Sequence, residues 1–163
     1  MTSIADARPA VARAGEAELL QHGTSSIRLL LDSSDTGGAI SAHRAVLGEG
    51  ALGASPHLHT GSSELFYVID GSVDVLAGDD LLTAEPGDLV VVPPGFVHGF
   101  RATHGRTAEM LVVVTPGIER FAFFRALAAV VNGTADRDTF MSDQARYDTY
   151  PASSVVWDLE RVQ

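Results

Sequence analysis

Apolar residues occur in short runs through the middle of the chain, and turn-forming residues separate these runs. Between residues 26 and 115 the runs read SIRLLL, AISAHRAVL, LFYVID, VDVLA, LVVV, VHGFRA and MLVVVT. The segments between them, such as DTGG, GDD, EPGD and PPG, hold the glycine, proline and aspartate residues that tight turns prefer. Short apolar runs at this spacing predict an all-β protein, either a sandwich or a barrel.

The pattern changes after Thr115. The segment IERFAFFRALAAVVNG places apolar residues at helical spacing, which predicts a helix over residues 116–131. Thr115 is the predicted N-cap, Pro116 the first helical residue and the Asn132-Gly133 pair the stop. A second, short helix is expected near residues 134–146.

These patterns divide the chain into three regions. Residues 1–25 are rich in alanine and mixed in charge, and we expect an N-terminal arm there, either frayed or forming a short helix. Residues 26–115 form the predicted barrel. Residues 116–163 form a predicted helical extension that packs on the barrel. No internal repeat is present in the sequence, so one barrel is expected and not two.

Composition narrows the function. The 163 residues carry a formal net charge of −10, which argues against nucleic acid or an anionic membrane surface as a partner. Every basic residue is an arginine, so Schiff-base chemistry through lysine is excluded. The absence of cysteine excludes thiol nucleophiles and cysteine-ligated clusters. Any metal must therefore bind through histidine and carboxylate groups.

No targeting or membrane signal is visible. The opening MTSIADARPAVARAGEAELLQ lacks the continuous apolar core of a secretory signal. The longest apolar runs fall far short of the roughly 20 residues that span a bilayer. We therefore expect a cytoplasmic protein that does not enter a membrane.

The segment PHLHTGSSE, residues 56–64, carries the first candidate ligands. Residues two apart on a strand point to the same face, so His57 and His59 are expected to aim together. Glu64 begins the next predicted strand and can reach the same point. Further on, the turn PPG redirects the chain toward His98. If these side chains face into a barrel, they form a metal site with three imidazoles and one carboxylate.

This arrangement resembles the cupin superfamily. The family's first motif, HxH followed by a glutamate and then a glycine, reads HLHTGSSELFYVIDG over residues 57–71. Its second motif, a glycine, then PxG, then a histidine, reads GDLVVVPPGFVH over residues 87–98. Ala51 and Ala102 depart from the glycine and asparagine that the family pattern expects, and neither position is a ligand. The resemblance implies a jelly-roll barrel of the small, single-barrel type.

The resemblance also implies a metal and a reaction. His57, His59, Glu64 and His98 would bind one divalent transition metal, and neutral imidazoles with a carboxylate suit Ni, Mn, Fe, Co or Zn. Among cupins the chain is similar to bacterial quercetin dioxygenase-like and polyketide-modifying proteins. This similarity implies a metal-dependent dioxygenase of secondary metabolism that acts, with O2, on a flavonol-like or other aromatic molecule. Glu64 would be both a ligand and the base that takes the proton of the substrate hydroxyl.

Two other classes of function remain open. One is O2-independent cyclisation or isomerisation of a polyketide, with the metal as a Lewis acid. The other is a small-ligand-binding barrel without catalysis. Bound zinc without oxygen uptake would favour the former, and bound ligand without turnover would favour the latter.

The chain's phenylalanines suggest an apolar substrate pocket. A flat aromatic molecule would fit such a wall better than a sugar. The pocket residues that we expect are Phe66, Val68, Phe96, Phe100, Phe121 and Phe124, with Phe123 as a further candidate.

Two further expectations concern the other histidines and the assembly. His22, His43 and His104 are expected at the surface or in hydrogen bonds, and only His43, on a strand, could point inward.

Exposed edge strands and the apolar helix over residues 118–131 predict a homodimer that covers a sheet edge.

Overall fold

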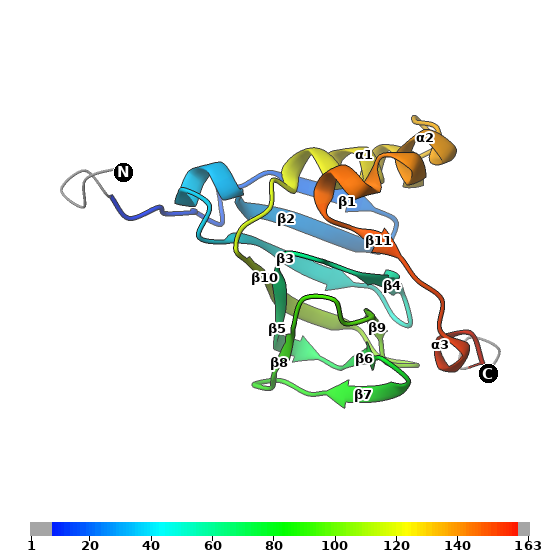
Figure 1. Cartoon of the computed structure of the whole chain (residues 1–163). Helices are drawn as coiled ribbons and strands as arrows, with labels where there is room; N and C mark the ends of the chain where they lie inside the picture. Colours follow the sequence, from blue (N-terminus) through cyan, green and yellow to red (C-terminus); the bar gives the residue numbers. More distant parts are fainter. Residues whose placement is uncertain (1–7, 160–163) are drawn as a thin grey trace.

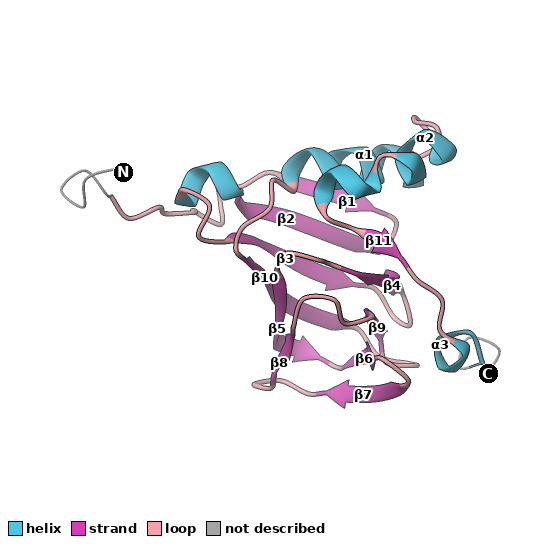
Figure 2. Ribbon diagram, viewed as in Figure 1, coloured by secondary structure: helices cyan, strands magenta, loops and turns pink. Residues whose placement is uncertain are grey.

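The structure is a computed structural model that describes residues 8–159, and its strands form two antiparallel β-sheets (Figures 1 and 2). The six-stranded sheet has the order β1 (Leu19–His22), β2 (Ser25–Leu31), β3 (Ser41–Leu47), β10 (Ala108–Thr115), β5 (Ser63–Gly71) and β8 (Leu89–Val92). The five-stranded sheet has the order β11 (Tyr150–Pro151), β4 (Leu52–Leu58), β9 (His98–Ala102), β6 (Val73–Ala77) and β7 (Asp80–Ala84).

The core lies between the two sheets. Side chains alternate between faces along a strand, and β10 shows this directly, because every second residue from Ala108 to Val114 is buried. Met110 and Phe66 from the six-stranded sheet meet Val75 and Phe100 from the five-stranded sheet in one apolar cluster. The all-β barrel predicted from the sequence is confirmed.

The N-terminal region differs from the expected arm. Residues 19–22 form strand β1, which pairs with β2 and extends the six-stranded sheet, so the strands begin before residue 26. None of the four side chains of β1 is buried, and its LLQH sequence has little apolar alternation. Pairing with β2 fixes this strand, and a local pattern could not reveal that pairing.

Helix α1 (Phe121–Val131) begins later than predicted. The predicted start at residue 116 is wrong, because Thr115 is the last residue of β10 and pairs with Ser63. The carboxylate of Asp32, which precedes the 3₁₀-helix η2 (Ser33–Thr36), accepts the N–H groups of Arg120 at 2.6 Å and Phe121 at 3.2 Å. A distant side chain therefore satisfies the first amides of α1, and no local cap is needed.

The apolar face of α1 packs on the outer strands of the six-stranded sheet (Figure 1). Phe123 and Phe124 of α1 form a second apolar cluster with Ile27 and Leu29 of β2. The helix ends at Val131 as predicted.

After α1, the chain returns across the barrel. It forms α2 (Arg137–Ser142), the 3₁₀-helix η3 (Gln144–Tyr147), β11 and α3 (Val155–Leu159). Strand β11 was not predicted, and it pairs with β4 opposite His57 and Leu58. Trp157 of α3 is buried. Within residues 8–159, no helix has both the length and the apolar character that crossing a membrane requires.

Candidate metal centre

His57, His59, Glu64 and His98 converge on one point. His57 of β4 and His98 of β9 lie directly opposite each other in the five-stranded sheet, and His59 follows β4. Glu64 approaches from β5 of the six-stranded sheet. One potential ligand atom from each residue lies within 4.8 Å of the others, and all four residues are buried. The cluster therefore joins the two sheets.

The Glu64 carboxylate lies among the three imidazoles. Its Oε2 atom is 2.7 Å from His98 Nε2, 3.3 Å from His59 Nε2 and 3.9 Å from His57 Nε2. All three rings thus turn the same nitrogen toward a single carboxylate oxygen.

Backbone carbonyls fix the orientation of each ring. A carbonyl oxygen can only accept a hydrogen bond, so the Nδ1 atom that contacts it carries the proton. These contacts are 2.8 Å from His57 Nδ1 to Ser55 O, 2.6 Å from His59 Nδ1 to Asp148 O and 2.9 Å from His98 Nδ1 to Phe96 O. When a ring is neutral, its Nε2 atom is therefore free to act as a ligand.

Charge at the cluster favours a cation. Burial lowers the pKa of His57 to about 4, even though the Glu64 charge opposes this, so the ring is neutral at pH 7. Burial alone raises the pKa of the Glu64 carboxyl, but the imidazoles of His59 and His98 outweigh it and hold this pKa well below its usual range. A carboxylate and an imidazole lone pair thus point at the same buried space. A divalent cation bound there would satisfy both groups, so the donor set fits the predicted metal.

Asp148 of the C-terminal extension fixes the loop that carries His59, Thr60 and Gly61. Besides its carbonyl contact with His59, Asp148 accepts the N–H groups of Thr60 and Gly61 through its carboxylate, each at 2.9 Å. The Thr60 hydroxyl donates to the same carboxylate. Asp148 has a left-handed backbone with φ of 48°, which aspartate and asparagine tolerate better than most residues. Sequence reasoning missed this residue, because it lies far from the ligand motifs along the chain.

We expect Asp148→Asn to weaken metal binding about 10-fold. Asparagine keeps the left-handed conformation but removes the negative charge, and its amide cannot accept from both Thr60 and Gly61 through two oxygens. Competition with a chelator of known affinity measures the change. Asp143→Asn is the matched control, since Asp143 lies exposed in the same extension and the one described contact of its side chain is an ion pair with Arg146 at 3.9 Å. An unchanged affinity in Asp148→Asn would show that the extension does not support the site.

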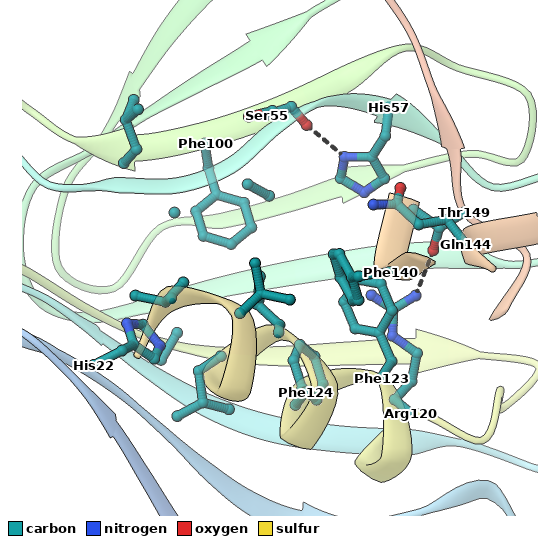
Figure 3. A pocket seen from close by; sticks show the side chains of 18 of the residues that line it. His22, Ser55, His57, Phe100, Arg120, Phe123, Phe124, Phe140, Gln144 and Thr149 are labelled. Carbon is teal, nitrogen blue, oxygen red and sulfur yellow. Dashed lines mark hydrogen bonds between the residues drawn. The ribbon is translucent and has the colours of Figure 1, made fainter. Parts of the chain in front are cut away.

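A cavity of about 570 Å³ adjoins the cluster (Figure 3). This volume lies within the range of roughly 300–1,000 Å³ that is typical of small-molecule sites. His57 and Glu64 form part of its wall, so two of the four candidate ligands face the open space. Most of the remaining wall is apolar, and it includes Leu47, Leu52, Phe100, Phe123, Phe124, Leu127, Val130, Phe140 and Met141.

The predicted pocket residues divide into two groups. Phe100 and Phe124 line the cavity, as does the further candidate Phe123. The other four residues do not line it. Phe66 and Val68 share the face of Glu64 but lie deeper in the barrel core, where Phe66 packs behind Phe100 with a centroid distance of 5.2 Å.

The remaining two predicted pocket residues lie away from this cavity for other reasons. Phe96 lies on the exposed turn before β9, with 42% of its surface accessible. Phe121, the first residue of α1, packs with the second apolar cluster, and the Arg125 guanidinium covers its ring at 5.7 Å.

Two histidines outside the motifs reach the cavity. His43 of β3 points inward and packs on Phe124 with a centroid distance of 4.3 Å. Burial and then the Arg120 charge lower the pKa of His43 to about 3, so it is neutral at pH 7. His22 also lines the cavity, whereas His104 is exposed as predicted. Arg120 is a further wall residue that sequence reasoning missed.

Comparison with known proteins agrees with this geometry. Residues 43–114 match the family model described as "Cupin domain", and this span contains all four candidate ligands. By its fold and by this match over residues 43–114, the chain has a single barrel of the cupin type, and it resembles quercetin dioxygenase-like proteins.

The individual proteins that the chain resembles have low sequence identity to it. Quercetin 2,3-dioxygenase of Bacillus subtilis (strain 168) is 29% identical over 136 residues, which cover 82% of this chain and 39% of that protein. This chain thus spans about two fifths of the relative's length. An RmlC-like cupin from Shewanella frigidimarina shares the fold at a TM-score of 0.58 and 20% identity, over 70% of this chain and 96% of the other. A sugar phosphate isomerase of the cupin superfamily from Silicibacter pomeroyi has a TM-score of 0.54 at 22% identity, over 64% and 74%.

Proposed function

We propose that this protein is a metal-dependent dioxygenase that acts on a flat, apolar aromatic molecule such as a flavonol or a polyketide-derived phenol. His57, His59, Glu64 and His98 would hold one divalent transition metal. Similarity to a quercetin 2,3-dioxygenase supports this reaction class. The shared fold alone does not, because cupin barrels serve many activities.

One observation carries the proposal: the cavity opens directly onto the candidate ligands. His57 and Glu64 belong to both the candidate metal cluster and the cavity wall, and Figure 3 shows the His57 ring at this wall. A molecule in the cavity can therefore reach the cluster without any rearrangement of the barrel. The aromatic rings of Phe100, Phe123 and Phe124 line the approach and suit a planar ring system.

When bound, the ion would supply a Lewis acid and an open coordination position for an oxygen ligand. The chain's own residues have separate roles. Oε2 of Glu64 faces the imidazoles, and no hydrogen bond to its Oε1 occurs within residues 8–159. Oε1 is thus available to accept the proton of a substrate hydroxyl. The apolar wall excludes water and strengthens the electrostatic interactions of this carboxylate.

Oxygen consumption tests the reaction. We expect protein loaded with Ni, Mn or Fe to consume O2 with quercetin or with a catechol, and chelator-treated protein to consume none. An oxygen electrode measures the uptake, and elemental analysis of the same samples reports the bound metal. Separate loading with each metal identifies the active ion.

The alternative functions predict different outcomes. Bound zinc with chemical conversion of a β-dicarbonyl substrate, but no O2 uptake, would contradict the dioxygenase and support a cyclase or isomerase. Tight binding of an aromatic ligand with no conversion under any metal would support a binding barrel instead.

The homodimer stays a prediction, but the apolar face of α1 no longer supports it. The apolar face of α1 packs on the barrel of its own chain, so it offers no surface to a partner. The apolar residues that remain exposed on one sheet edge are Tyr67 and Ile69 of β5 and Leu89 and Val91 of β8.

A further inference from the structure

Arg120 is a buried cation in the wall of the cavity. It immediately precedes α1, and only 5% of its surface is accessible. Nη1 donates to Thr149 Oγ1 at 3.1 Å and more weakly to Tyr147 O at 3.4 Å. The guanidinium lies over the ring of Phe123 at 4.6 Å (Figure 3). Arg120 thus stands between the apolar wall and the C-terminal extension.

This guanidinium has unused hydrogen-bond donors. Within residues 8–159, Arg120 forms no ion pair with a carboxylate, and its buried Nε atom has no hydrogen-bond partner. Its Nη2 atom likewise has no hydrogen bond to a described residue. A buried charge without a direct counter-ion is costly, because burial removes its hydration. The two bonds from Nη1 leave most of that cost in place.

A purely structural role for Arg120 explains only part of this arrangement. The contacts of Nη1 tie the start of α1 to the extension, and a neutral donor such as glutamine could make them too. These contacts of Nη1 do not explain why a positively charged side chain lies in a mainly apolar wall. The free donors of the planar guanidinium form a fork that matches the two oxygens of a carboxylate.

The balance of charge in the cavity points to an anionic ligand. His43 is neutral, so it adds no positive charge beside Arg120. A divalent ion on three neutral imidazoles and the Glu64 carboxylate would carry one net positive charge, and Arg120 adds another. The carboxylates of Asp148 and Asp32 attract the Arg120 charge through space, but within residues 8–159 neither forms an ion pair with the guanidinium, and both already accept backbone N–H groups. One anionic oxygen of a ligand would face the metal, and a second anionic group of the same ligand could bind to Arg120.

We propose that Arg120 binds a carboxylate of the aromatic small molecule that occupies the cavity, while another oxygen of that molecule faces the candidate metal centre. An aromatic molecule that carries a carboxylate should therefore bind this cavity more tightly than a neutral polyphenol of similar size. This inference rests on the proposed function for the position of the metal, but the carboxylate site itself depends only on Arg120.

Paired probes test this site. In zinc-loaded protein, we expect 2-naphthoate to bind at least about 10-fold more tightly than 2-naphthamide, because a carboxylate forms charge-assisted hydrogen bonds with the guanidinium. Arg120→Gln should reduce this preference to about one, with the affinity for 2-naphthamide nearly unchanged. Arg137→Gln is the matched control, since Arg137 also lines the cavity but is exposed, and it should keep the preference. Isothermal titration calorimetry measures all the affinities.

Three outcomes would overturn the inference. One is equal affinity of the wild-type protein for both probes. Another is a preference that survives Arg120→Gln but disappears when the metal is removed, which would place the carboxylate on the metal and leave the proposed metal site intact. If thermal melting shows that Arg120→Gln is unfolded, Arg120→Lys decides. Lysine keeps the charge without the fork, so the preference should fall without vanishing, and an unchanged preference is the third contrary outcome.

Discussion

Replacing His98 with alanine should abolish stoichiometric metal binding. His98 Nε2 is the nitrogen nearest to the Glu64 carboxylate, at 2.7 Å, and its ring is buried and fixed by the Phe96 carbonyl. Alanine removes one of the four candidate ligands, and nothing else in the cluster can replace it. We expect elemental analysis of purified His98→Ala protein to find at most a small fraction of one metal per chain, for every metal that the wild-type protein retains.

The control must separate loss of a ligand from loss of the fold. His104→Ala removes an exposed histidine outside the cluster and should keep full metal content. The His98 variant should keep its far-ultraviolet circular dichroism spectrum, because the barrel core of Phe66, Met110 and Val75 lies beside the site and does not depend on the ion. Full metal content in a folded His98→Ala protein would contradict the site.

The ligand cluster could be predicted because strand geometry determines it. His57 and His59 lie two residues apart, so alternation places them on one face, and antiparallel pairing then brings His98 opposite His57. Glu64 opens the next strand, in the facing sheet. The spacing of His57, His59 and Glu64 is local and can be read from the sequence. The pairing of His98 with His57 is long-range, and the resemblance to the cupin motifs predicted it.

The cavity wall could not be predicted in the same way. Phe66 and Phe100 both lie on inward faces of strands, yet Phe66 belongs to the closed core and Phe100 to the cavity. The difference depends on where α1 and the extension cover the barrel, which is a property of tertiary packing. Phe124 lines the cavity because Asp32 sets the start of α1 and pairing of β1 with β2 provides its support.

The residues that sequence reasoning missed share one origin. Arg120 and Asp148 come from the segment after the barrel, and each acts on a group far away in the sequence. Asp148 orients a candidate ligand, and Arg120 places a charge in the cavity. The barrel therefore supplies the candidate ligands, whereas the extension closes the cavity and adjusts what it can bind.

Glu64→Gln should reduce turnover at least about 100-fold per bound metal, if the protein is the dioxygenase proposed above. Glutamine has nearly the same shape, and its amide can donate to the lone pair of His59 or His98, so the cluster stays packed. It cannot take a proton from a substrate hydroxyl at neutral pH. Oxygen uptake should be measured at saturating metal and divided by the metal content of the same sample, because the variant will also bind the ion more weakly.

Two comparisons make this result specific to proton transfer. Quercetin should bind Glu64→Gln with an affinity close to that of the wild-type protein, since the aromatic wall of Phe100, Phe123 and Phe124 is unchanged. Glu64→Asp keeps a carboxylate base, but its shorter side chain places this base farther from the cavity. Its turnover per metal should therefore lie between that of the wild-type protein and that of Glu64→Gln. If Glu64→Gln keeps turnover per metal within a few-fold of wild type, Glu64 serves only as a ligand, and the substrate must lose its proton to another group. Neutral His43, which faces the same cavity, would then be the next residue to replace.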